Sequence, residues 1–317
     1  DYYHKKTRDL LQDVKIPSST GFGSMMVNSG HITNEGLELT GKFYVLQNTP
    51  LKWNIDANIS FNRNRIGGLK ADQFAQKLWS SADEVFIQRN GCPIGAIYGY
   101  VEDGFYDNLA EVMASPSADI RAKGAGMIGE IKYRNFDDNP DITSADRVII
   151  GDTNPDFVYG LTSNFEWKGV TLSFFLQGSQ GNDIFNGNLM DMKMGNVGNI
   201  TREAYNTRWT EANAAQAKWP KAVSGYERNM LISNRYVEDG SYLKLKSLNI
   251  GYVWKPNFKG ISNVNVYASV TNLFTITGYS WFDPEVNAFG SDASRRGVDV
   301  YSYPSSRTFS LGIKVDF

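Results

Sequence analysis

The chain ends on a segment, RTFSLGIKVDF, in which apolar and polar side chains alternate at every position. Successive side chains of a β-strand point to opposite faces of the sheet, so this alternation predicts a strand with one apolar and one polar face. The pattern continues to the last residue, Phe317, although chain termini are usually poorly ordered. We therefore expect the last residue to be held in a sheet.

The same two-residue period recurs along the rest of the chain. It is strict in GLELTGKFYV (36–45), LKWNIDANISFN (51–62), GVTLSFFLQG (169–178) and NVNVYASVTN (263–272). It is less regular in DFVYGLTSNFEWK and in SYLKLKSLNIGYVW, where the phase changes near Ser247 as a β-bulge would cause. The opening segment DYYHKKTRDLL also reads as the end of a strand. These segments approach the roughly 9–11 residues that a tilted strand needs to cross a bilayer.

The predicted connections between these strands alternate between long and short. Long connections cover about residues 10–32 and the segments 66–155, 180–240 and 276–305, whereas QNTPLK, EWKG and PNFKGIS are short turns. Antiparallel strands therefore place every long connection at one end of the sheet. Outer-membrane β-barrels have this asymmetry, with short periplasmic turns and long extracellular loops.

Composition narrows the function classes. Aromatic residues make up 13% of the 317 residues, and the net charge is −2, which leaves no basic footprint for nucleic acid. The single cysteine, Cys92, excludes an internal disulfide framework. There is no run of about 18 apolar residues, so no transmembrane helix is predicted. Two all-β folds remain: a barrel with a wet lumen, and a carbohydrate-binding β-sandwich with its apolar faces buried on each other.

Several blocks resemble SusC-like TonB-dependent transporters, the outer-membrane nutrient importers of Bacteroidetes. They include NSGHITNEGLEL, GCPIGAIYGYVEDGFYDN, NRYVEDGSYLKLKSLNIGYVW, NVYASVTNLFTITGYSWFDPE, YSYPSSRTFSLGIKVDF and the long segment from GEIKYRNFDDNPDITSAD to FFLQGSQGNDIFN. These blocks occur in the family's order and span the chain from Asp1 to Phe317. The resemblance implies a multi-pass barrel in the outer membrane that imports oligosaccharides or peptides without covalent chemistry.

The resemblance also implies partners. Such transporters are barrels of about 22 strands with a plugged lumen. They work with a SusD-like lipoprotein that lids the barrel, take energy from TonB through the plug, and present a terminal aromatic, here Phe317, to the barrel-assembly machinery. We count only about eight to ten strands of such a barrel, and nothing in the sequence resembles the plug. The chain is therefore expected to be the C-terminal portion of the barrel, with 66–155, 180–240 and 276–305 as extracellular loops.

One segment resembles a calcium loop. Asn135, Asp137, Asn139, Asp141 and Asp146 occupy positions 1, 3, 5, 7 and 12 of an EF-hand-type series, which calcium ligation requires. Pro140 stands where that motif has Gly. The alternative is an Asx-rich turn whose side chains cap its own backbone.

Aromatic residues in the long connections are candidate contacts for a solute or a partner. They are Trp79, Trp209, Trp219, Tyr279, Trp281 and Phe282. The alternative is that these rings pack the loops. Polar residues of the strands, such as Asn62, are candidates to face the lumen.

A glycoside hydrolase would need two carboxylates about 5–9.5 Å apart in a cleft. The adjacent pair Glu238 and Asp239 does not suit this chemistry, because neighbouring residues of a strand point to opposite faces. The two histidines, His4 and His31, have no ligand-spaced partner.

Overall fold

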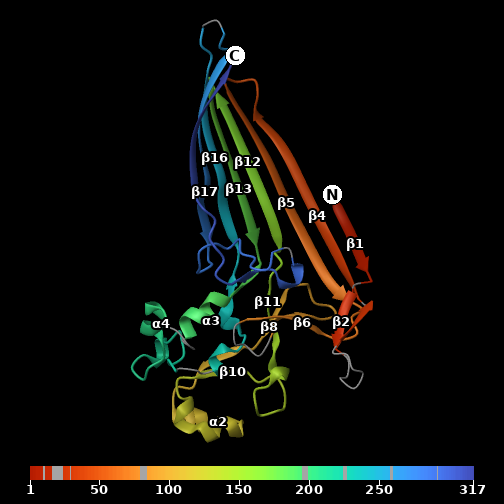
Figure 1. The fold of residues 1–317 in the computed structure, drawn as a ribbon, viewed down its shortest axis with the longest axis vertical. Coiled ribbons are helices and arrows are strands. Elements are labelled where there is room, and N and C mark those ends of the chain that lie inside the picture. The colour runs from red at the N-terminus through yellow and green to blue at the C-terminus, as the bar shows by residue number, and fades with distance from the viewer. Residues whose placement is uncertain are drawn as a thin grey trace.

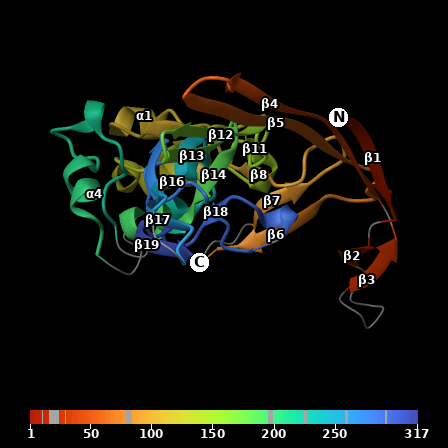
Figure 2. The same ribbon diagram turned by 90° about the horizontal axis from the view of Figure 1, so that it is seen from above.

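The computed structural model describes residues 1–9, 11–15, 24–28, 30–78, 84–194, 199–223, 227–257, 260–290 and 292–317. A long sheet forms one part of the molecule, and shorter strands and helices gather at one end of it (Figure 1). Viewed along its length, the sheet follows an arc from β1 through β12 to β19 (Figure 2).

The long sheet, here called the wall, has eight strands that pair in the order in which they follow along the chain. Every neighbouring pair is antiparallel. The strands are β1 (Tyr2–Arg8), β4 (His31–Leu46), β5 (Leu51–Gly67), β12 (Phe157–Trp167), β13 (Val170–Gln180), β16 (Tyr242–Trp254), β17 (Asn263–Thr277) and β19 (Thr308–Asp316). The segments with a two-residue period form these strands, so the predicted antiparallel β fold is confirmed. The expectation that Phe317 is held in the sheet is wrong, because β19 ends at Asp316 and the last residue lies beyond its final backbone pairing.

The register of the wall aligns its apolar residues across the strands. Leu172 lies opposite Ile250, Ile250 opposite Ala268, and Ala268 opposite Leu311. One face is therefore apolar from strand to strand, and many of its large side chains are exposed, with Ile250 at 52% and Leu311 at 88%. A β-sandwich would bury this face under a second sheet. The β-sandwich alternative is therefore wrong.

The irregular phase of β16 is a β-bulge. The register with β17 shifts between Leu245 and Ser247, and β13 continues without a gap opposite the same place. Lys246 is the extra residue, which confirms the bulge predicted near Ser247.

The short turns of the wall are tight. Lys168 and Gly169, which join β12 to β13, both have positive φ angles of 46° and 87°. A two-residue turn of this kind matches the twist of the flanking strands, and glycine adopts it without steric cost. The segment 47–50 joins β4 to β5 at the same end of the wall, where the C-terminus also lies (Figure 1).

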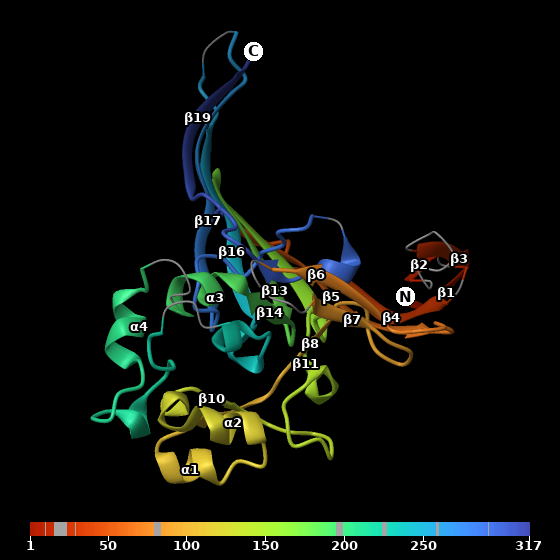
Figure 3. The ribbon, with the colours of Figure 1, turned by 60° about the horizontal axis from the view of Figure 1, so that its bottom comes forward.

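The described parts of the long connections 68–156, 181–241 and 278–307 lie at the opposite end (Figure 3). Their described parts are folded and are here called the loop layer. Its strands are β6 (Gln73–Lys77), β7 (Glu84–Gln88), β8 (Ala96–Gly99), β9 (Glu102–Phe105), β10 (Ile131–Tyr133), β11 (Val148–Asp152), β14 (Asp183–Asn186), β15 (Val237–Asp239) and β18 (Val298–Asp299), and its helices are α1 (Leu109–Met113), α2 (Ala118–Lys123), α3 (Gly187–Met194) and α4 (Arg202–Thr207).

A further hairpin, β2 (Leu11–Lys15) with β3 (Ser24–Asn28), connects β1 to β4. The buried apolar core lies in the loop layer and includes Phe86, Phe185 and Tyr236 at 0% exposure. Within the described ranges, no helix is both long and apolar enough to cross a membrane.

Candidate functional site

An ion-paired cluster fastens the loop layer to the polar face of the wall. Lys244, near the start of β16, is only 1% exposed, and its ammonium donates to Asp283 over 2.8 Å. Asp283 also accepts the backbone N–H groups of Glu285 and Ser305. Burial alone would raise the pKa of Asp283, but these hydrogen bonds, above all that from Lys244, lower the pKa to about 2.

Glu285 extends the cluster along the wall. It accepts hydrogen bonds from Lys244, from Lys246 at the bulge over 2.6 Å, and from the Tyr242 hydroxyl over 3.2 Å. Burial would raise the pKa of Glu285, and the two ammonium groups lower it further than burial raises it. The cluster therefore holds a carboxylate that stays ionised near neutral pH.

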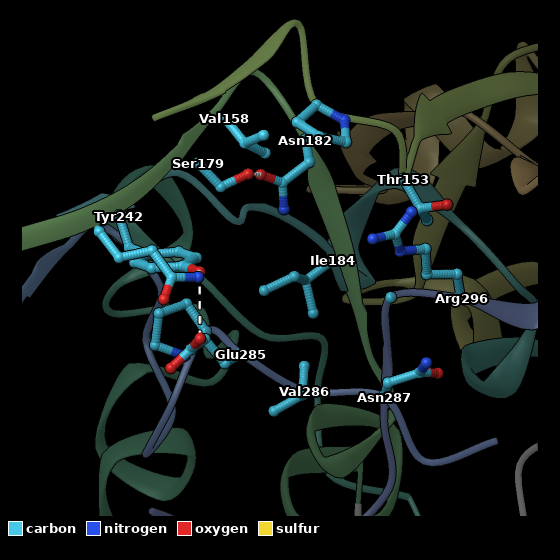
Figure 4. A pocket seen from close by; sticks show the side chains of 14 residues that line it. Thr153, Val158, Ser179, Asn182, Ile184, Tyr242, Glu285, Val286, Asn287 and Arg296 are labelled. Carbon is cyan, nitrogen blue, oxygen red and sulfur yellow. Dashed lines mark hydrogen bonds between the residues drawn. The ribbon is translucent and has the colours of Figure 1, made fainter. Parts of the chain in front are cut away.

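A cavity of about 320 Å³ lies between this cluster and the wall (Figure 4). Gln177 and Ser179 line it from β13, Asn182 and Arg296 from the loop layer, and Tyr242 and Glu285 from the cluster. In Figure 4, Arg296 stands on the side opposite Tyr242 and Glu285. The lining offers amide, hydroxyl and charged groups, which can hydrogen-bond a polar solute.

The cavity continues along the polar face of the wall. A second cavity of about 160 Å³ shares Pro155, Val158 and Arg296 with the first. A third of about 240 Å³ shares Asn62, Asn154 and Pro155 with the second. Asn62, expected from the sequence to face a lumen, therefore borders a row of three adjoining cavities, here called the groove.

The proposed calcium loop caps its own backbone. Oxygens of Asn135, Asp137 and Asn139 each accept the N–H group two residues further on, over 2.8–3.1 Å. Both oxygens of Asp146, which is fully buried, accept N–H groups, from Phe136 over 2.7 Å and from Thr143 over 2.8 Å. Asp141 accepts the Ser117 hydroxyl.

The contacts to N–H groups are the ones that the Asx-turn alternative predicts, because each of these side chains caps the backbone of its own loop. In the part of the chain that the structure describes, no group of three acidic, histidine or cysteine side chains is arranged to hold a metal ion. Calcium binding by this loop stays a prediction.

Most of the candidate aromatic residues pack inside the loop layer. Trp209, Trp219 and Tyr279 are 5–7% exposed. Their polar atoms donate to Asp107, Glu203 and Asp299 respectively.

Trp281 is half-buried, and its ring meets Phe282 edge-on, with 5.3 Å between the centroids. Phe282 is 71% exposed and stays a candidate contact for a partner or solute. Trp79 lies outside the described residues.

The remaining candidates occupy structural or terminal positions. Glu238 accepts hydrogen bonds from Asn186 and Ser280, and Asp239 accepts the N–H group of Ser241. Both carboxylates therefore hold connections together. Phe317 is 90% exposed, and its role as an assembly signal stays a prediction.

The sequence reasoning missed Lys244, Asp283, Glu285 and Arg296. The only available signals were the WFDPE and SRRG segments, in which charges adjoin a Pro or Gly turn residue. Nothing local indicates that Lys244 and Asp283 meet, because they are 39 residues apart.

No protein-family model matches the chain. TonB-dependent receptor P3 of Formosa agariphila is 34% identical over 333 residues, which cover all of this chain and 32% of that receptor. TonB-dependent receptor SusC of Bacteroides thetaiotaomicron is 28% identical over 331 residues, covering all of this chain and 30% of SusC. The structure of the RagAB peptide transporter matches with a TM-score of 0.74 at 23% identity, over all of this chain and 32% of that one.

The wall and these relatives together define the class: the chain has the fold of a portion of a TonB-dependent receptor barrel. Within that class it is homologous to the SusC-like receptors, which confirms the resemblance seen in the sequence. The chain spans about a third of the length of the curated relatives that it matches.

Proposed function

We propose that this chain forms part of the barrel wall and the extracellular loops of a TonB-dependent outer-membrane importer. The observation that carries the proposal is the wall itself, with one exposed apolar face and folded connections only at the far end. Such a face suits lipid, and long connections at one end suit the extracellular side. The receptors related in sequence support the transport class.

The edges of the wall support a larger barrel. No described strand pairs with the outer edge of β1 or β19. Unpaired backbone groups are not tolerated in hydrocarbon, so further strands must close the sheet. The whole receptor would supply these strands, the plug and the contact with TonB.

We further propose that the solute is an oligosaccharide or a peptide that is too large for porins, and that a SusD-like lipoprotein lids the loop layer. The name of one structural relative, the RagAB peptide transporter, supports the peptide class, and relation to SusC supports a SusC-like system. The amide-rich groove along Asn62 and Gln177 suits either class, since amides hydrogen-bond both hydroxyls and peptide groups.

Deletion of the receptor gene in its host tests this function. We expect the receptor in the outer-membrane fraction as a heat-modifiable band, with a lipoprotein that co-purifies. Growth on a polymeric or peptide nutrient is expected to fail after deletion and to return with the gene on a plasmid. A product that stays soluble without detergent would contradict the proposal.

A further inference from the structure

The charged groups that border the groove are mostly paired within the protein. Glu285 is paired with Lys244 and Lys246, Asp292 with Arg295 over 2.7 Å, and Arg63 with Asp156 over 2.9 Å. Such pairs leave these groups little charge to offer to a solute.

Two exposed arginines of the groove, Arg65 at the cavity of about 240 Å³ and Arg296, form no side-chain hydrogen bond or ion pair with any residue that the structure describes. Of the two, only Arg296 also borders the cavity next to the ion-paired cluster. It borders the cavity of about 320 Å³, the one of about 160 Å³, and another of about 230 Å³ beside Asn287. One cation is therefore shared by three adjoining cavities.

The backbone around Arg296 fixes its position. The next residue, Gly297, has a φ angle of 73° and accepts the N–H group of Phe185, and a Cβ atom there would lie 2.9 Å from the Thr153 side chain. From Val298 the chain runs parallel to β14 as β18. The guanidinium is therefore presented from a packed segment rather than from a free loop.

We propose that Arg296 is a binding subsite for the carboxylate of an imported solute, with the amides of Gln177, Asn182 and Asn287 binding its neutral part. This inference rests on the import function proposed above. A guanidinium binds a carboxylate through two parallel N–H···O bonds, which a neutral side chain cannot replace. Glu285 stands across the cavity, but Lys244 and Lys246 already pair with it, so it does not compete with the solute for the guanidinium of Arg296.

Uronate-containing oligosaccharides and peptides both carry carboxylates. Isothermal titration calorimetry of the full-length receptor in detergent distinguishes these sources with four probes: trigalacturonate, its neutral methyl ester, and N-acetylated tetra-alanine with a free or an amidated C-terminus. We expect one acidic probe to bind more tightly than its neutral partner, which identifies the source.

Arg296→Gln is expected to weaken the preferred acidic probe at least about tenfold, the scale of a hydrogen bond to a charged group, and to leave its neutral partner unchanged. Arg296→Lys keeps the charge but lacks the planar guanidinium. Its affinity for the acidic probe should therefore lie between those of the wild type and Arg296→Gln. Arg295→Gln is the matched control, because it removes one charge at the neighbouring position, whose guanidinium already binds Asp292.

Equal affinity of wild type and Arg296→Gln for the acidic probe would overturn the subsite, as would equal weakening of both members of a pair. Failure of all four probes to bind the wild type would overturn it as well. The growth test of the deletion strain is independent of these titrations, so the import function is decided separately.

Discussion

At the scale of single residues, Asp146 shows why one motif allows two interpretations. A calcium loop and an Asx-rich turn both place carboxylates at alternating positions, so spacing alone does not separate them. The path of the backbone gives a further observation, because it brings the N–H groups of Phe136 and Thr143 to the two oxygens of Asp146, as the turn interpretation predicts. Pro140, which stands where the calcium motif has Gly, is a local signal for the turn.

Asp146→Ala is expected to destabilise the segment around it by about 2 kcal/mol, because two partly buried N–H groups lose their acceptor. Hydrogen exchange of residues 131–150 measures this, with and without EDTA. Asp138→Asn is the control, since Asp138 is exposed. If EDTA alone speeds hydrogen exchange in the wild-type segment as much as the substitution does, calcium rather than the backbone is the partner of Asp146.

At the scale of elements, the strands could be predicted and their partners could not. A two-residue period is local, so it revealed β16 and its bulge near Ser247. The two-residue period carries no information on Glu285, which accepts hydrogen bonds from Lys244 and Lys246, each about 40 residues away in the sequence. Long-range ion pairs of this kind depend on how the loop folds, which alternation does not specify.

Asp283→Asn tests how this cluster anchors the loop. The folded-state pKa of Asp283, about 2, lies below its ordinary value of 3.8, so its ionised form stabilises the fold. This contribution is complete above about pH 4 and is lost as the pH falls toward 2.

We therefore expect Asp283→Asn to lower the melting temperature near neutral pH, by the equivalent of about 2 kcal/mol for a charged hydrogen bond. The difference in melting temperature between the variant and the wild type should shrink as the pH falls from 4 to 2. Calorimetry of the detergent-solubilised receptor measures this difference. Asp103→Asn, at an exposed ion pair with Arg134, is the control and should cost little at any pH. A difference in melting temperature that stays constant down to pH 2 would contradict a stabilising role for ionised Asp283.

At the scale of the whole molecule, the wall and the loop layer differ in how far the sequence predicts them. The wall buries no core of its own, and its pattern is readable because each strand repeats the same two faces. The loop layer has a core assembled from distant segments, such as Phe185 beside Val298, and its aromatic rings look alike in sequence whether packed or exposed. This is why the sequence indicated long connections but did not separate Trp209, which is packed, from Phe282, which is exposed.

The two faces of β19 make the last prediction. Leu311 lies on the apolar face and Ser310 on the polar face, and they are neighbours in sequence. An arginine facing lipid near the middle of the bilayer costs about 2–4 kcal/mol, and one facing a wet lumen costs little. Leu311→Arg should therefore reduce the heat-modifiable, folded fraction of receptor in the outer membrane, and Ser310→Arg should not. Equal loss from both would mean that β19 fails for lack of pairing, whereas no loss from Leu311→Arg would mean that this face does not meet lipid.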